Sequence, residues 1–330
     1  MTTPTNRRNK RLTQRRGGAL LAVLWLSAAL SAIAYSLANT VRGEMERTST
    51  DLDGLRSYYL ARSGIDRAIL YMQWGNGAPP TAPFKYKPGT ALLPFTFPSG
   101  PAVVEIIPET AKLNINFAPP PELLRVLLAL GAEPARADQI VAAIVDWRSP
   151  VGITPFDGFY QSLTPSFRSR HASFEETEEL LLLRGMTREL YYGGYYHDAN
   201  GRLVPHGGLR DCVSVFGSRA VLDVNGVAPA VLVAIGMSPE AAAAIVARRR
   251  VQPFKSVGEV ADLVGGSPAL SRLRVGGNFI FTLRSTARIT LPNGQLSDMR
   301  RTVATTVIFR PDAEDIKLQT LRWYDNAWIP

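Results

Sequence analysis

Three histidines and one cysteine are the side chains of this sequence with the most familiar catalytic chemistry. His171, His197 and His206 are scattered through loop-like sequence, and no HExxH, GxSxG or phosphate-binding loop motif accompanies them. Cys212 lies beside a strand-like stretch, where a lone cysteine is usually a small buried hydrophobic residue. The sequence therefore nominates no enzyme active site, and one cysteine cannot form an intrachain disulfide.

Carboxylate and amide oxygens offer a second kind of chemistry, the binding of Ca²⁺. Such oxygens occur around Asp198–Asn200 and Asp223–Asn225, but no EF-hand spacing is present. Four acids within Glu175–Glu179 form a cluster typical of a first helical turn, where negative charge meets the positive end of the helix dipole. The sequence thus allows calcium without assigning its ligands, and it predicts no other cofactor.

A duplicated pattern carries many of these polar residues. The segment LNINFAP begins at residue 113 and its counterpart LDVNGVAP at residue 222, an offset of 109 residues. An apolar helix, a glycine turn and a second helix follow each segment, which predicts two helical hairpins. Ser173 and Ser256 are predicted to cap a third helix in each copy. The residues that mark the repeats are Asn114, Asn116, Pro119, Gly131, Asp146, Trp147, Arg148, Asp223, Asn225, Pro229 and Gly236.

The second hairpin resembles the helix-hairpin-helix module, and this gives an alternative function, that of a membrane-anchored extracytoplasmic DNA-binding protein. In that module turn glycines expose N–H groups to a phosphate. Here the turn is Ile235-Gly236-Met237-Ser238, which lacks the second glycine of a Gly-x-Gly turn, and the first copy has Glu133 at its turn. The net charge is +9, but six positive charges lie in residues 1–16, so the rest of the chain carries only +9 − 6 = +3. A packing or partner-binding module is favoured, and no nucleic acid is expected.

These motifs follow an N-terminal stretch that can cross a membrane. Residues 17–41 contain no charge, and about 20 apolar residues span a bilayer core of roughly 30 Å. Residues 1–16 hold six basic residues and no acid, which predicts a cytoplasmic N-terminus and an extracytoplasmic body. The predicted membrane helix includes Ala19, Leu20, Leu21, Val23, Leu24, Trp25, Leu26, Leu30 and Ile33.

Three interpretations of this start remain open: a signal anchor, a signal peptide cut before Asn39, or a leader cut after Gly18. The third resembles the type IV pilin family, whose leader ends in glycine directly before the hydrophobic helix. That resemblance implies a prepilin peptidase that cleaves after Gly18 and methylates Ala19. The fifth mature residue of most such subunits is glutamate, whereas this chain has Val23.

The remaining pattern predicts an α+β protein. Apolar residues at helical spacing, among them Leu52, Leu55, Tyr59, Ile65, Met72 and Trp74, favour one long helix to about Gln73 over two helices broken near residues 39–43. Residues 75–101 are rich in proline and glycine and predict a loop. Strands are predicted at residues 102–108, 279–283, 302–309 and 318–328, with a hairpin turn at Asn293-Gly294.

Taken together, the chain resembles the GspK (general secretion pathway protein K) family, the largest minor pseudopilins of the type II secretion system. The resemblance rests on RRGGALLAVLWLSAAL at the leader, AKLNINFAPPPELL, IVAAIVDWR at 140–148, residues 160–165 and 174–186, and the second LDVNGVAP segment. It implies a type IV pilin-like fold, a long N-terminal helix on an antiparallel sheet, with a large inserted all-α helical-hairpin domain.

The resemblance also implies a division of the chain and a set of partners. The expected parts are a leader (1–18), a membrane helix (19–41), the periplasmic half of the spine (42–74), a pilin-like loop and strand (75–113), the insert (114–274) and the C-terminal strands (275–330). Expected partners are the minor pseudopilins GspI and GspJ, the pseudopilus, the assembly platform, the prepilin peptidase and the inner membrane. The expected role is to initiate or cap a pseudopilus from its tip.

Overall fold

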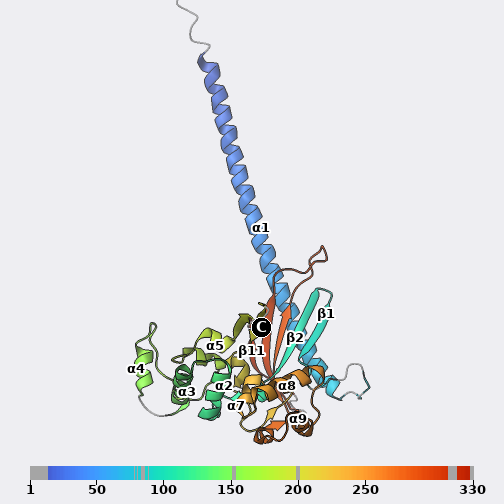
Figure 1. Ribbon diagram of the computed structural model, residues 1–330. Coiled ribbons are helices and arrows are strands. Elements are labelled where there is room, and N and C mark those ends of the chain that lie inside the picture. Colours follow the sequence, from blue (N-terminus) through green and yellow to red (C-terminus); the bar gives the residue numbers. More distant parts are fainter. Residues whose placement is uncertain are drawn as a thin grey trace, which may run out of the picture.

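One uninterrupted helix, α1 (Gln14–Gly77), forms the spine of the molecule (Figure 1). The structure is a computed structural model that describes residues 14–77, 79, 81–82, 86–87, 89–150, 154–197, 201–310 and 318–327. The 64 residues of α1 extend for about 96 Å at 1.5 Å per residue. The prediction of a single long helix is therefore confirmed, and the alternative break near residues 39–43 does not occur.

The face that α1 buries is made largely of small residues. Gly54, Ser57, Ala61, Gly64 and Ala68 are all buried, at spacings of three, four or seven residues that place them on one side of the helix. The predicted apolar stripe was only partly correct. Ile65 and Met72 are buried, but four of its large members are exposed: Leu52, Leu55, Tyr59 and Trp74. Small side chains let the helix axis approach the sheet closely, so the bulky residues fall on the outer side.

A five-stranded antiparallel sheet lies against this face, in the order β1-β2-β9-β10-β11 (Figure 1). Its strands are β1 (Leu92–Phe97), β2 (Gly100–Pro108), β9 (Ile280–Ala287), β10 (Arg301–Phe309) and β11 (Leu318–Tyr324). Residues 75–101 were predicted to form a loop, which was wrong at β1. The segment LLPFTF pairs with β2 despite its proline. As an edge strand, β1 accommodates Pro94.

The hairpin predicted between the two C-terminal strands is present. β9 pairs antiparallel with β10, and Gly294 takes a positive φ of 79° in the connection. The last strand ends at Tyr324, so the predicted strand to Trp328 was too long: residues 325–327 are described and are not in a strand, and Trp328 lies outside the described residues. Because β2 and β9 are neighbours in the sheet, everything between Pro108 and Ile280 is an insertion into an α+β body. The predicted fold class is confirmed.

The insert is mostly helical and closes on itself through short parallel strand pairs. Its first half contains η1 (Glu109–Ala111), β3 (Leu113–Asn114), α2 (Pro120–Ala129), α3 (Pro134–Arg148), α4 (Pro155–Gln161), η2 (Thr177–Leu182), α5 (Arg188–Tyr192), β4 (Gly194–His197) and β5 (Leu203–His206). The second half contains α6 (Leu209–Cys212), β6 (Val213–Ser214), β7 (Leu222–Asp223), α7 (Pro229–Ala234), α8 (Pro239–Val251), α9 (Val257–Val264), η3 (Pro268–Arg272) and β8 (Leu273–Arg274). β3 pairs with β6, and β7 pairs with β8.

Gly64 gives a direct test of how closely the spine sits on the sheet. A Cβ atom at this position would lie 2.5 Å from Ser285 Oγ, 3.1 Å from Ala102 Cβ and 3.3 Å from Val104 Cγ2. Gly64→Val is therefore expected to lower the free energy of unfolding by about 1–3 kcal/mol, as overpacking does. Thermal unfolding followed by circular dichroism measures this. Gly43→Val is the control, because nothing lies within 4 Å of a Cβ there. Equal effects of the two substitutions would contradict the close contact.

Candidate functional site

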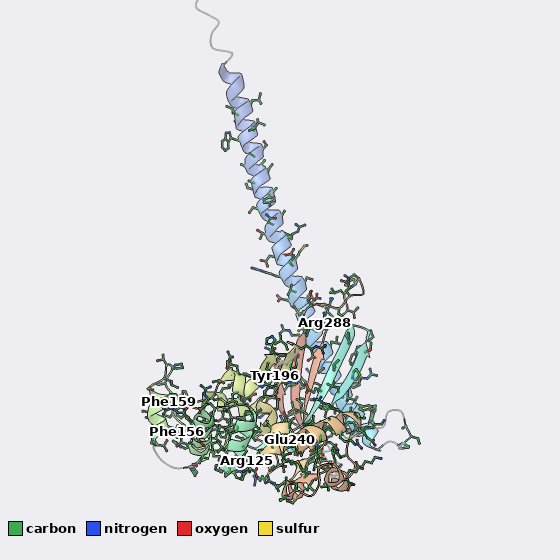
Figure 2. All side chains as sticks on the ribbon, viewed as in Figure 1. Arg125, Phe156, Phe159, Tyr196, Glu240 and Arg288 are labelled. Atoms are coloured by element: carbon green, nitrogen blue, oxygen red, sulfur yellow. The ribbon has the colours of Figure 1, made fainter. Side chains whose placement is uncertain are left out.

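The membrane segment of α1 stands clear of the rest of the molecule. Figure 2 shows its side chains projecting around the upper half of the helix with no other element beside them. One stretch of α1 is long and apolar enough to cross a membrane; its 18-residue window has a mean hydropathy of 2.0, and none of that window is buried. All nine predicted membrane residues, from Ala19 to Ile33, are exposed. They therefore present an apolar surface that this chain itself does not cover.

The predicted cleavage point lies inside this helix. Gly18 and Ala19 are both in α1, which begins at Gln14, and a Cβ on Gly18 would have nothing within 4 Å. Val23, which occupies the usual glutamate position, is also exposed on the same apolar surface. The site is thus reachable from outside, and the residues of the leader before position 14 lie outside the described part of the chain.

The two repeats of the insert use the same hydrogen bonds. In the first, the side chain of Asn116 accepts from the Phe174 N–H at 2.7 Å and donates to the Phe174 carbonyl at 3.0 Å. In the second, Asn225 accepts from the Phe254 N–H at 2.9 Å and donates to the Phe254 carbonyl at 3.0 Å. Each asparagine therefore clamps the segment that follows the second helix of its own hairpin.

An arginine at the end of each second helix completes the repeat. Arg148 donates to the carbonyls of Ile115 at 2.8 Å and Ala118 at 2.9 Å. Arg249 occupies the matching position in the second copy, where it donates to the carbonyls of two residues, Val224 at 2.8 Å and Val227 at 2.7 Å. Desolvation by burial lowers the pKa of Arg249 to about 10 and also lowers the pKa of Arg148. Both arginines are internal braces of their hairpins.

The remaining repeat residues have structural positions. Pro119 precedes α2 as its N-cap, Pro229 opens α7, and Gly131 and Gly236 take positive φ values of 85° and 108° in the two hairpin turns. Asn114 accepts from the Asn116 N–H and donates to two carbonyls of the β6–β7 connection. Asp146 accepts a 3.4 Å hydrogen bond from the Ser169 hydroxyl. The predicted duplication is thus confirmed as two copies of one hairpin module.

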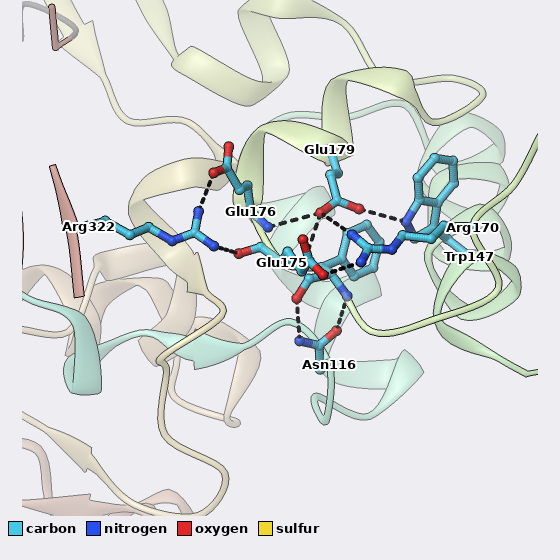
Figure 3. A network of polar contacts seen from close by, with 8 residues as sticks. Asn116, Trp147, Arg170, Glu175, Glu176, Glu179 and Arg322 are labelled. Atoms are coloured by element: carbon cyan, nitrogen blue, oxygen red, sulfur yellow. Dashed lines mark hydrogen bonds and ion pairs between the residues drawn. The ribbon is translucent and has the colours of Figure 1, made fainter. Parts of the chain in front are cut away.

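The acidic cluster forms a cap and a network of polar contacts (Figure 3). Glu179 accepts from the N–H groups of Glu175 at 2.8 Å and Glu176 at 3.0 Å through one oxygen. Its other oxygen accepts from Trp147 Nε1 at 3.1 Å. The prediction that Ser173 caps a helix here was wrong, because Glu176 caps the 3₁₀ helix η2 instead; Ser256 does cap α9 as predicted. Because its carboxylate accepts hydrogen bonds from these N–H groups, Glu179 has a structural role in this segment.

The two predicted calcium segments differ in what can be said of them. The Asp223 carboxylate accepts hydrogen bonds from the N–H groups of Asn225 and Gly276 and from the Asn278 amide. Three N–H donors already surround these oxygens, which is the reverse of what a cation needs. Residues 198–200 lie outside the described part of the chain. Within the described ranges no group of three or more His, Cys, Asp or Glu side chains could hold a metal ion.

Ser169, His171 and Asp157 are the trio that most resembles a catalytic triad in the described part of the chain. His171 Nε2 lies 3.1 Å from Asp157 Oδ2, but the Ser169 hydroxyl donates to Asp146 and no hydrogen bond joins it to the histidine. A nucleophilic serine needs its base within hydrogen-bond reach. The trio therefore holds the segment around α4 in place. Cys212 is fully buried, and burial raises the pKa of its thiol, so it is not poised as a nucleophile.

The His171–Asp157 contact should make the α4 segment sensitive to pH. The Asp157 side chain raises the pKa of His171 above its ordinary value of 6.5. The stabilising contact is then fully present below about pH 6.5 and is lost as the pH rises through the folded-state pKa. We expect His171→Gln to flatten the pH dependence of unfolding in this window, measured by chemical denaturation at several pH values. His206→Gln on the β4–β5 hairpin is the control, and an unchanged profile in His171→Gln would refute the assignment.

The hairpin turns do not present a phosphate site. The Glu133 carboxylate accepts from the N–H groups of Ala135 and Arg136, so an acid of the chain already occupies the N-terminus of α3. In the second copy the turn N–H groups of Gly236 and Met237 donate to carbonyls within α7. Arg125, labelled in Figure 2, donates to the Ala234 carbonyl and joins α2 to the second repeat. The turn N–H groups that would contact a phosphate are therefore already hydrogen-bonded within each hairpin.

Comparison with known proteins agrees with this architecture. Residues 111–192, which contain the first repeat, match the model of a family described as type II secretion system (T2SS), protein K. Over these residues the chain is similar to the type II secretion system protein K family. A curated relative, the type II secretion system protein K of Klebsiella pneumoniae, is 26% identical over 196 residues, which cover 54% of this chain and 60% of the relative. The match thus spans less than two thirds of the length of that protein K.

A solved structure shares the fold of this chain. It is the crystal structure of the GspK–GspI–GspJ complex from the type 2 secretion system of enterotoxigenic Escherichia coli. The alignment has a TM-score of 0.56 and 15% identity, and it covers 84% of this chain and 98% of the matched chain. At this identity the likeness concerns the fold alone, and it supports the predicted long helix, antiparallel sheet and helical insert.

Proposed function

We propose that this chain is a minor pseudopilin at the tip of a type II secretion pseudopilus, where it initiates or caps assembly and supports protein export across the outer membrane. The observation that carries the proposal is the insertion of a complete helical-hairpin domain between β2 and β9 of a spine-and-sheet body. Because each pilin-like subunit packs its spine against neighbouring subunits, a body with such bulk beside its sheet fits an end position better than a repeated one.

The apolar part of α1 gives the proposed localisation. It forms a single-pass anchor in the bacterial inner membrane, with the N-terminus cytoplasmic and the chain beyond the membrane helix periplasmic, and the prepilin peptidase cuts between Gly18 and Ala19. A carboxylate within an apolar helix bundle must be paired with another group. Because Val23 replaces the usual glutamate, this subunit needs no such partner on a subunit ahead of it. The proposed partners are the minor pseudopilins GspI and GspJ, the pseudopilus and the assembly platform. The role is structural and not catalytic.

The first experiment is mass spectrometry of the mature N-terminus from native membranes. The proposal expects a chain that begins with methylated Ala19. An intact Met1 would indicate a plain signal anchor, and a chain starting at Asn39 would indicate a released protein; either result overturns the pseudopilin proposal. The tip position is tested separately by immunogold labelling of assembled pseudopili, where labels distributed evenly along the fibres would exclude it.

The alternative, an extracytoplasmic DNA-binding protein, can be tested with the same preparation. Phosphate contacts make binding strong at low salt and steeply weaker as salt rises. The internal bonding of Arg249 and the occupied N-terminus of α3 lead us to expect no retention of the detergent-solubilised chain on immobilised duplex DNA at moderate salt. Salt-dependent retention would favour the alternative.

A further inference from the structure

The molecule has two hydrophobic cores that share no residue. One core consists of buried residues between Leu113 and Leu273, all within the insert. The other joins α1 to the sheet and runs from Leu60 to Val307, without a residue of the insert. Each part therefore buries its own apolar side chains, and the contact between them does not depend on a common core. Below, the insert is called the head, and α1 with its sheet is called the body.

The covalent links between head and body lie together at one place, the pivot, formed by residues 108–112 and 275–279. Thr110 donates to the Asn278 side-chain oxygen at 2.7 Å, and Asn278 donates to Asp223 at 2.5 Å, so the two crossing strands are tied side by side. Gly276 and Gly277 both have positive φ values, of 71° and 72°. Glycine adopts positive φ values readily, whereas other residues rarely do. These two glycines therefore give the backbone of the crossing more conformational freedom.

A second connection, away from the chain crossings in sequence, is made by one side chain of the last strand. Arg322 of β11 pairs with Glu176 at 2.5 Å and donates to the Glu175 carbonyl (Figure 3). It also lies over the Phe216 ring, 6.0 Å from the ring centroid. All three of these partners belong to the head. The guanidinium is partly exposed, with 23% of its side-chain surface accessible, so these contacts face solvent. We call this set of contacts the latch.

Between the latch and the pivot lies a small cavity with a mixed polar and apolar lining. Its volume is about 50 Å³, which holds a few water molecules at 10–15 Å³ of occupied volume each. The lining includes Glu109 and Lys112 at the pivot, Thr282 and Thr306 on the sheet, and Arg322 at the latch. Relative motion is the default expectation between separately packed parts of a chain whose contact is not large and hydrophobic.

We propose that the head is a rigid body that turns on the sheet about the pivot, and that the Arg322 latch holds it in the orientation described here. Opening the latch exchanges an ion pair and a hydrogen bond for contacts with water and disrupts neither core. The head can thus change its direction relative to the membrane helix while both parts stay folded. This inference concerns the chain itself and does not rest on the proposed secretion role.

The test measures the distance between head and body in the full chain in detergent micelles by double electron–electron resonance. Spin labels are placed at Val251→Cys on the head, where 88% of the residue is exposed, and at Asp298→Cys on the body, whose side chain is fully exposed. Cys212 is buried and remains unlabelled under native conditions. The parent chain is expected to give one narrow distance distribution.

Arg322→Ala is expected to broaden that distribution or add a second distance, with unchanged helical content by circular dichroism. Glu176→Gln should have a smaller effect, because the bond to the Glu175 carbonyl remains. Arg168→Ala, which removes an exposed arginine of the head, is the matched control and should leave the distribution unchanged. Raising the salt concentration on the parent chain should broaden its distribution in the same direction as Arg322→Ala.

Two results would overturn the proposal. An unchanged distribution in Arg322→Ala would mean that the latch does not set the orientation of the head. A loss of helical content in the same variant would mean that head and body do not fold as separate units. In that case, raising the salt concentration on the parent chain would broaden the distance distribution only when the protein unfolds.

Discussion

Replacing Trp147 by alanine is expected to lower the free energy of unfolding of the head by about 3–5 kcal/mol, the range for truncating a buried aromatic residue. Only 3% of Trp147 is exposed, and its ring stacks on Phe174 with centroids 6.1 Å apart and meets Tyr160 edge-on at 5.9 Å. The substitution also leaves Glu179 without its indole donor. A cavity and a lost hydrogen bond thus act at the same place.

Trp74 supplies a matched control for this substitution. It lies near the end of α1 with 70% of its surface exposed, so Trp74→Ala makes the same chemical change with an expected effect within about 0.5 kcal/mol. Urea denaturation of the full chain, followed by far-ultraviolet circular dichroism, compares the two. Similar midpoints would contradict the central position of Trp147 in the first repeat.

Because the two cores are separate, the effect of Trp147→Ala should be confined to the head. Native-state hydrogen exchange should show faster exchange at the amides of α3, with β9 and β10 unchanged. Faster exchange throughout both parts would mean that the cores unfold as one unit. A single unfolding free energy is well defined only for a two-state protein, so the exchange data also decide how the denaturation curves are analysed.

The sequence predicted the architecture where the pattern was long and repeated. A 25-residue uncharged stretch, the Asn-Gly turn and the duplicated LNINFAP and LDVNGVAP segments each depend on local chemistry, and the structure contains all three. The inward-facing stripe of α1 was harder to predict, because glycine, serine and alanine carry little hydrophobic signal, although Ala61 is fully buried and Gly64 lies directly against the sheet. β1 was missed because Pro94 suggests a loop.

The long-range contacts could not be predicted from local patterns. Nothing near Arg322 indicates that it reaches Glu176, 146 residues earlier (322 − 176 = 146), and nothing near Glu179 indicates that it accepts from Trp147. The structural role of Arg249, however, could be predicted from the sequence. Aligning the repeats places IVARR (245–249) over IVDWR (144–148), so Arg249 matches Arg148 rather than standing in an undivided basic run.

That alignment leads to the second large expected effect, at Arg249. Arg249→Ala removes the donor of two carbonyl oxygens, and an unsatisfied buried acceptor costs about 1–3 kcal/mol. We expect the head to lose about 3 kcal/mol of unfolding free energy in the same denaturation experiment. Arg249→Lys should recover only part of this loss, because an ammonium group cannot reproduce the planar fork of the guanidinium.

Arg250 is the control that separates internal bracing from surface charge. It is the next residue in α8, it is exposed, and Arg250→Ala removes the same charge with an expected effect within about 0.5 kcal/mol. If the arginine run served as a basic surface, the two substitutions would affect stability equally little and would weaken the binding of a polyanion equally. A large loss of stability at Arg249 alone instead establishes that the second repeat, like the first, uses its terminal arginine to hold the hairpin closed.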